Sequence, residues 1–219
     1  MFELMILPLL YRATKRHLRA RGHSCATVFV YRMPPLSTRL ATVADLDILV
    51  ADVQAGFDSY VEFAPLGWMA PNAFADTSFM AELLADRDTW ALLALSGSEP
   101  LGHIAFTPSR QRTAGKPWAN SPSTPGLAHL WQLFVLPEWW GQGVAPLLHE
   151  AAIAEIRDRG YQAVRLYTPS LHARARRFYE RRGWRVTGEL WNDLLTLMLT
   201  EYQLGAGAGS GLGLGLGLG

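Results

Sequence analysis

The chain has 219 residues, of which 49% are hydrophobic and 11% aromatic, and its formal net charge is +1. This length fits one domain with extensions, and the apolar fraction is ample for a core. The near-neutral charge and the lack of any run of about 20 apolar residues exclude a strongly basic nucleic-acid-binding body and a membrane-spanning helix.

Residues 1–36 differ from the rest of the chain because they are basic. Six arginine and lysine side chains against a single acid, Glu3, give this stretch a net charge of +5, which leaves −4 for the remainder. We expect a poorly ordered extension. The alternative is a short amphipathic helix over residues 4–21 that meets a membrane surface, a nucleic acid or an acidic partner. Cys25, the only cysteine, lies here. No intrachain disulfide can form, and we expect a cytoplasmic protein without nucleic-acid partners.

Apolar periodicity and turn residues indicate a folded domain over residues 37–204. In chain order they predict a strand at 40–43, helices at 45–55 and 77–85, strands at 90–95, 101–107 and 127–136, a helix between Gly143 and Gly160, a strand at 163–168, a helix at 171–182, and strands at 184–188 and 193–202. The expected fold class is α/β (α+β), with a mixed, mostly antiparallel sheet of six to seven strands flanked by helices. The low-complexity stretch 205–219 is expected to be a flexible tail.

The stretch from 127 to 149 organises the chain. An apolar strand ends at Leu136 and Pro137, and the turn Gly141-Gln142-Gly143 opens an amphipathic helix. Such a turn presents backbone N–H groups beside the positive end of the helix dipole, which suits a phosphate or pyrophosphate. The alternative is that the two glycines only let the chain turn tightly.

Two segments resemble the GNAT superfamily of acyl-CoA-dependent N-acyltransferases. Residues 140–145, WGQGVA, are similar to the family turn Q/R-x-x-G-x-G/A, and they follow LFVLPE at 133–138, which matches the family's strand end. Residues 175–180, ARRFYE, followed by Gly183-Trp184, are similar to the family's A-x-x-F-Y-E…G-F segment. The resemblance is strong over 127–188, weaker over 37–107 and absent from both termini. It implies a GNAT fold whose central strands splay apart.

The resemblance implies acetyl-CoA as the cosubstrate and no metal. Backbone N–H groups of 141–145 would hold its pyrophosphate, and an unpaired strand edge near 133–135 would receive the pantetheine amides and polarise the acetyl carbonyl. Trp140 departs from the family's Gln or Arg, and His172 stands where the family often has Asn. The cofactor-binding residues expected on this basis are Leu133, Phe134, Val135, Trp140, Gly141, Gln142, Gly143, Val144, Ala145, His172 and Ala175.

The same resemblance implies direct attack of an amine on the thioester, which needs a base for the amine and an acid for the thiolate. Tyr179 matches the family's tyrosine that protonates or hydrogen-bonds the departing thiolate. The alternative is that Tyr179 is an aromatic residue that only packs on its helix. His129 lies six residues before Val135, where some members carry a glutamate base, and strand alternation places it on the face of Trp131, Leu133 and Val135. The alternative is a half-buried strand histidine, and His103 is a weaker candidate for the base.

The implied acceptor is a primary amine, first of a small molecule and second of a protein or peptide. A non-catalytic module that binds CoA or another metabolite is the remaining alternative. The loops at 56–76 and 108–126 would form the acceptor pocket. The first loop combines several aromatic residues with Asp58 and Glu62, which suits a cationic amine, unless the aromatics only pack the helices. The sequence leaves open whether the chain forms a homodimer.

Overall fold

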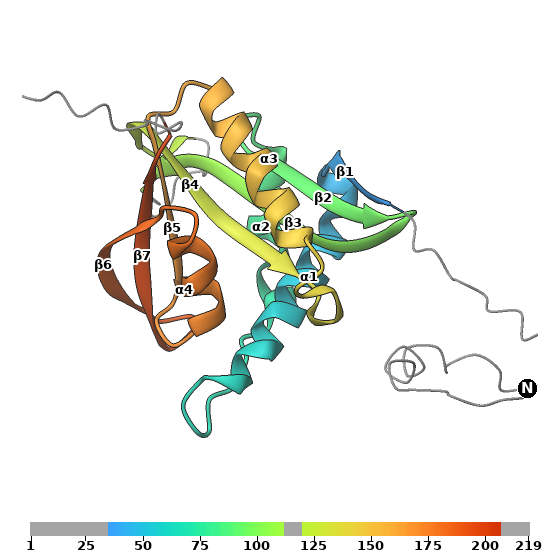
Figure 1. Cartoon of the computed structure of the whole chain (residues 1–219), viewed down its shortest axis with the longest axis vertical. Coiled ribbons are helices and arrows are strands. Elements are labelled where there is room, and N and C mark those ends of the chain that lie inside the picture. The colour runs from blue at the N-terminus through green and yellow to red at the C-terminus, as the bar shows by residue number, and fades with distance from the viewer. Residues whose placement is uncertain (1–34, 112–119, 207–219) are drawn as a thin grey trace, which may run out of the picture. The chain divides into compact units, whose positions relative to one another are not determined.

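A mixed sheet of seven strands runs through the residues that the computed structural model describes, 35–111 and 120–206 (Figure 1). The strand order is β1-β2-β3-β4-β5-β7-β6, and of these neighbours only β4 and β5 are parallel. The strands are β1 (Leu36–Leu40), β2 (Trp90–Ser96), β3 (Glu99–Arg110), β4 (Ser123–Val135), β5 (Ala163–Pro169), β6 (Arg185–Asn192) and β7 (Leu197–Gly205). The predicted mixed, mostly antiparallel α/β fold is confirmed.

Helices flank both faces of the sheet. Val50, on the helix over residues 46–59, and Met80, on the helix over 77–85, belong to a small apolar cluster. Leu148, on the helix over 144–158, and Tyr179, on the helix over 173–180, belong to the main core on the other face. The order of strands and helices agrees with the prediction. No helix in the described ranges is long and apolar enough to cross a membrane. The α-helices are α1 (Leu46–Ser59), α2 (Thr77–Ala85), α3 (Val144–Asp158) and α4 (Ala173–Glu180).

A β-bulge interrupts β4 at Trp131. Ala105 of β3 pairs with Gln132, but the next residue, Phe106, pairs with Leu130, so Trp131 is an extra residue in β4. Because side chains alternate along a strand, one extra residue moves those that follow it to the opposite face.

Because of this bulge, His129 and the residues after Trp131 do not share the face that the sequence pattern predicts. Leu133 and Val135 pack against the main core, together with Ala128 and Leu130, the two neighbours of His129. Successive strand residues point to opposite faces, so His129 faces the side of α1 and α2. It shares that face with Trp131, as expected, but not with Leu133 and Val135. The sequence pattern fails here because the bulge depends on how β4 pairs with β3.

β4 and β5 diverge soon after they pair. Their parallel ladder joins only 127–129 of β4 to 163–165 of β5. β5 stays paired with β7 along its whole length, whereas β4 has no partner among the described strands on this side from 130 to 135. The predicted splay of the central strands is confirmed, and the open edge of β4 leaves backbone groups that a ligand can meet.

α1 is longer than predicted because Gly56 does not end it. The helix continues to Ser59, with Gly56 buried against the ring of Phe134 on β4. A Cβ at position 56 would overlap that ring. The glycine therefore allows a close approach of helix and strand, a use that the sequence alone does not distinguish from a helix stop.

The ends of the folded region also differ from the prediction by a few residues. β1 occupies 36–40, ahead of the strand expected at 40–43. β7 extends to Gly205, and Ala206 is buried with its carbonyl oxygen accepting from Arg157 Nε at 2.6 Å. The fold thus continues two residues into the expected tail. The rest of that tail, and residues 1–34 with Cys25, lie outside the described residues.

Candidate active site

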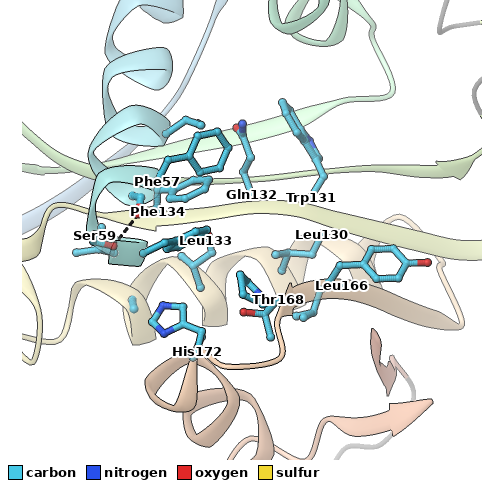
Figure 2. A pocket seen from close by; sticks show the side chains of 18 of the residues that line it. Phe57, Ser59, Leu130, Trp131, Gln132, Leu133, Phe134, Leu166, Thr168 and His172 are labelled. Atoms are coloured by element: carbon cyan, nitrogen blue, oxygen red, sulfur yellow. Dashed lines mark hydrogen bonds between the residues drawn. The ribbon is translucent and has the colours of Figure 1, made fainter. Parts of the chain in front are cut away.

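A cavity of about 980 Å³ opens between the diverging strands β4 and β5. Its walls come from α1 and the segment after it, the start of α3, and α4. Figure 2 shows Leu133 of β4 on one side, with Thr168 of β5 and His172 on the other. Every residue expected to bind the cosubstrate or to act in catalysis lines this cavity, except Gln142, Val144 and the weaker candidate His103.

The glycine turn before α3 has an open backbone. Gly141 and Gly143 have φ of +79° and +89°, and a Cβ added to either would meet no described atom within 4 Å. Gly143 is the N-cap of α3, so no side chain competes for the first N–H groups of the helix. Val144 packs in the core, and the Gln142 side chain donates to the Glu138 carbonyl at 2.7 Å. Val144 can therefore serve a ligand only through its backbone, and one side-chain donor of Gln142 is already engaged.

Trp140 makes two contacts with its large ring. Its indole Nε1 donates to the Val135 carbonyl at 2.8 Å, so one acceptor near the end of β4 is occupied. The Arg174 guanidinium carbon lies 4.4 Å from the ring centroid, a cation–π contact. Among the described residues Arg174 has no ion pair with a carboxylate. A positive charge without a counter-ion is thus held in the cavity wall.

Tyr179 is 7% exposed and lines the cavity. Its ring packs edge-on against Phe178 and Trp184 and at a tilt against Tyr202. Burial raises the pKa of its hydroxyl, and the neighbouring Tyr60 adds to this effect, so the phenol is protonated at neutral pH. A protonated hydroxyl here can donate a hydrogen bond or a proton to a departing thiolate.

His172 forms the N-cap of α4 and lies in an aromatic cluster. Its imidazole stacks on Phe63 with ring centroids 4.6 Å apart, and it meets Tyr60 edge-on at 5.7 Å. Burial, together with the charge of Arg174, lowers its pKa to about 4. The ring is therefore neutral at pH 7 and can offer a ligand one donor and one acceptor.

His129 lines the cavity at the point where β4 and β5 separate. Its ring meets Tyr167 of β5 edge-on, with centroids 5.5 Å apart. Burial and the positive charge of Arg165 lower its pKa to about 3. The neutral imidazole can accept a hydrogen bond from an amine, but a proton taken from the amine must pass on quickly because the charged form is disfavoured.

His103 is fully buried and does not line the cavity. Its Nδ1 lies 2.8 Å from Asp52 Oδ2 on α1, and its Nε2 lies 2.9 Å from Gln132 Oε1 on β4. Gln132 itself lines the cavity. The chain from Asp52 through His103 to Gln132 therefore anchors the bulged part of β4 to α1.

The charge of the cavity wall is entirely positive within the described residues. No aspartate or glutamate lines this part, which corrects the expectation for Asp58 and Glu62. Asp58 instead accepts from Gln54 on the exposed side of α1, and Glu62 is exposed. Of the aromatics expected beside the acceptor, Phe57 and Tyr60 do line the cavity. Its charged lining residues are Arg174, Arg177, Arg181 and Arg182.

Sequence patterns give no signal for several residues of this site. Arg174 is one of several arginines on the polar face of a helix, and nothing local links it to Trp140. The contact of Gln132 with the cavity depends on the bulge beside it.

Comparison with known proteins agrees with this geometry. A family model described as the acetyltransferase (GNAT) family matches residues 54–184. N-acetyltransferase 8 of Rattus norvegicus is 29% identical over 116 residues, which cover 53% of this chain and 48% of that protein. The chain thus spans about half the length of this curated relative.

Solved structures with the same fold share little sequence with this chain. A GCN5-related N-acetyltransferase from Rhodopseudomonas palustris has a TM-score of 0.60 at 17% identity, covering 84% of this chain and 99% of its own. The PaiA N-acetyltransferase of Thermoplasma acidophilum, in complex with coenzyme A, has a TM-score of 0.56 at 16% identity, covering 76% and 98%. At these identities the likeness concerns the fold.

The family match covers more than half of the chain and includes the open edge of β4, the glycine turn and Tyr179. The chain belongs to the GNAT family of acetyltransferases.

Proposed function

We propose that this enzyme transfers the acetyl group of acetyl-CoA to a primary amine of a small molecule. The observation that carries the proposal is the meeting of three features in one cavity. These are the glycine turn before α3, the unpaired edge of β4 and the buried hydroxyl of Tyr179. The coenzyme A complex of the Thermoplasma relative supports acetyl-CoA as the donor.

The cosubstrate fits a continuous set of residues. The N–H groups of 141–145 suit its pyrophosphate, and the edge of β4 at 133–135 suits the amides of its pantetheine arm. Arg174, supported by Trp140, supplies a positive charge and hydrogen-bond donors, in place of the polar contact that the motif's usual Gln or Arg side chain would make. His172 and Ala175 line the same cavity.

The transfer step follows from this placement. The amine nitrogen bonds to the acetyl carbon, the carbon–sulfur bond breaks, one proton leaves the nitrogen and one joins the sulfur. Tyr179 donates a proton to the departing sulfur, because burial keeps its hydroxyl protonated, and it regains a proton from the water that takes up the proton of the amine. A backbone N–H on the open edge of β4 polarises the acetyl carbonyl.

His129 is proposed to accept a hydrogen bond from the attacking amine, directly or through water. Because its charged form is disfavoured, the proton moves on to water instead of remaining on the ring. His129→Ala should therefore lower kcat about tenfold or more, whereas His129→Gln, which keeps an acceptor, should retain part of the activity. Equal kcat values for wild type and His129→Ala at saturating substrate would remove His129 from the mechanism.

A small-molecule acceptor is favoured by the size of the site. The cavity of about 980 Å³ must hold part of the cosubstrate as well, so the space that remains suits an acceptor with a small body. A protein or peptide amine is the competing outcome of the test below.

The test is an acceptor screen with acetyl-CoA, in which small amines and lysine-containing peptides are compared by release of free CoA thiol. Tyr179→Phe should lower kcat about 100-fold while acetyl-CoA binding stays near wild type. Tyr161→Phe, which removes a hydroxyl outside the cavity, is the matched control. Acetyl-CoA binding without thiol release from any amine would overturn the proposed function.

A further inference from the structure

The two sides of the cavity differ in chemical character. The arginines lie on α4 and directly after it. The side formed by α1, α2 and the α1-facing residues of β4 is instead apolar and aromatic. It is lined by Phe57, Phe79, Met80, Trp131 and Phe134.

Three polar side chains on this apolar side, Ser59, Asn72 and Gln132, already have hydrogen-bond partners within the protein. The buried Trp131 Nε1 has no partner among the described residues, but as a donor it cannot accept a hydrogen bond from an ammonium group. Ser59 Oγ donates to the Gly56 carbonyl at 2.6 Å, and Gln132 is engaged by His103. Asn72 Oδ1 accepts from the Phe74 backbone N–H at 3.0 Å. No carboxylate lines the described part of the cavity. A cationic group bound here would lose its hydration without gaining a counter-charge from any described lining residue.

We infer that the acceptor is a monoamine whose body is apolar or aromatic, so that the reacting nitrogen is its only basic group. The apolar body would lie against α1 and α2, with the amine directed toward the open edge of β4. A second ammonium group would meet either apolar side chains or the arginines of α4, and both are unfavourable. This inference rests on the proposed function and names its substrate class.

The same surroundings assist the chemistry. An ammonium group that enters an apolar wall loses hydration, which lowers its pKa and favours the neutral amine that attacks the thioester. His129 and His172 show the effect of this environment, since burial is the main cause of their low pKa values of about 3 and about 4. A strong base is therefore not required for such an acceptor.

The test compares acceptors with the same six-carbon chain, with and without a second amino group. With the 219-residue chain and acetyl-CoA, kcat/KM for hexylamine should exceed that for 1,6-diaminohexane by about 30-fold, because no described lining residue offers the second ammonium a counter-charge. 2-Phenylethylamine should be used at least as well as hexylamine, since aromatic side chains line the recess. The rates are measured by thiol release at several pH values, so that the two reacting nitrogens are compared at equal neutral fractions.

A designed carboxylate should change this preference. Phe79→Glu places an acid in the apolar wall and should narrow the ratio between monoamine and diamine about tenfold by pairing with the second ammonium. Ala75→Glu, at an exposed position of the same lining, serves the same purpose if Phe79→Glu does not fold. Val61→Glu, on an exposed residue outside the cavity, is the control with the same charge and should leave the ratio unchanged.

The outcomes separate the two proposals. If wild-type enzyme prefers the diamine or lysine peptides over hexylamine, the inference about the acceptor is wrong, and the acetyltransferase proposal stands. If the ratio is as expected but both glutamate variants, folded and active, leave it unchanged, the explanation through cavity charge is wrong. Failure of every amine to release thiol overturns the proposed function itself.

Discussion

Trp140 occupies the position where the family motif has glutamine or arginine, and it brings no charge of its own. Its ring instead supports the guanidinium of Arg174, and its Nε1 holds the Val135 carbonyl. A stacked guanidinium has less freedom to lose when it binds a phosphate. At the scale of single residues, Arg174 on α4 can thus supply the phosphate contact that Trp140 does not make.

Arg174→Ala should raise the KM for acetyl-CoA about tenfold, because a charge-assisted contact to phosphate is lost, with little change in kcat. Arg185→Ala, which removes an equal charge from an exposed position on β6 outside the cavity, is the control and should leave the KM unchanged. Steady-state kinetics with a fixed, saturating amine provide the measurement. A KM equal to that of wild type would show that Arg174 does not contact the cosubstrate.

At the scale of elements, the cavity depends on how closely α1 approaches β4. Gly56 permits this approach, and Phe57 then meets Phe134 edge-on with ring centroids 5.9 Å apart. The bulge at Trp131 and the contact between His103 and Gln132 fix which β4 side chains point toward α1. The shape of the apolar recess is therefore set by one glycine and one strand irregularity.

Gly56→Ala should destabilise the domain by about 2 kcal/mol, because the clash with the Phe134 ring outweighs the gain of up to about 1 kcal/mol in helix propensity. Urea denaturation gives the free energy of unfolding. Combining the change with Phe134→Leu should recover part of the loss. Ala51→Ser, at an exposed position of the same helix, is the control. An increase in stability on Gly56→Ala alone would contradict the packing role of this glycine.

At the scale of the whole molecule, several histidines are kept neutral by burial. His149 is 5% exposed and its Nε2 accepts from Trp184 Nε1 at 3.0 Å, an arrangement that protonation would break. Burial and the charge of Arg182 lower its pKa to about 4, below the usual value near 6.5. The unfolded chain therefore binds more protons than the folded one between pH 6.5 and 4, so stability must fall as the pH falls through this window.

The free energy of unfolding should accordingly decrease from pH 7 to pH 4, with a contribution of up to about 3 kcal/mol from His149. His149→Gln, whose amide oxygen can still accept from Trp184, should reduce this pH dependence. Urea titrations at pH 7 and pH 4.5 for both proteins provide the comparison. Asp45 does not contribute to the difference between pH 7 and pH 4.5. Its pKa is lowered to about 2 by Arg39, so its contribution to the free energy of unfolding is lost only below this range. Identical pH dependence in the two proteins would contradict the assignment to His149.

The sequence by itself determined the order of the elements, the glycine turn and the segment that carries Tyr179. Each of these depends on a local pattern: apolar periodicity, a left-handed turn or a short motif. Only the tertiary structure decided the bulge that reorients the residues after His129, the pairing of Trp140 with Arg174 and the absence of carboxylates from the described cavity lining. These features depend on strand register and on contacts between segments far apart in the chain, which no local pattern encodes.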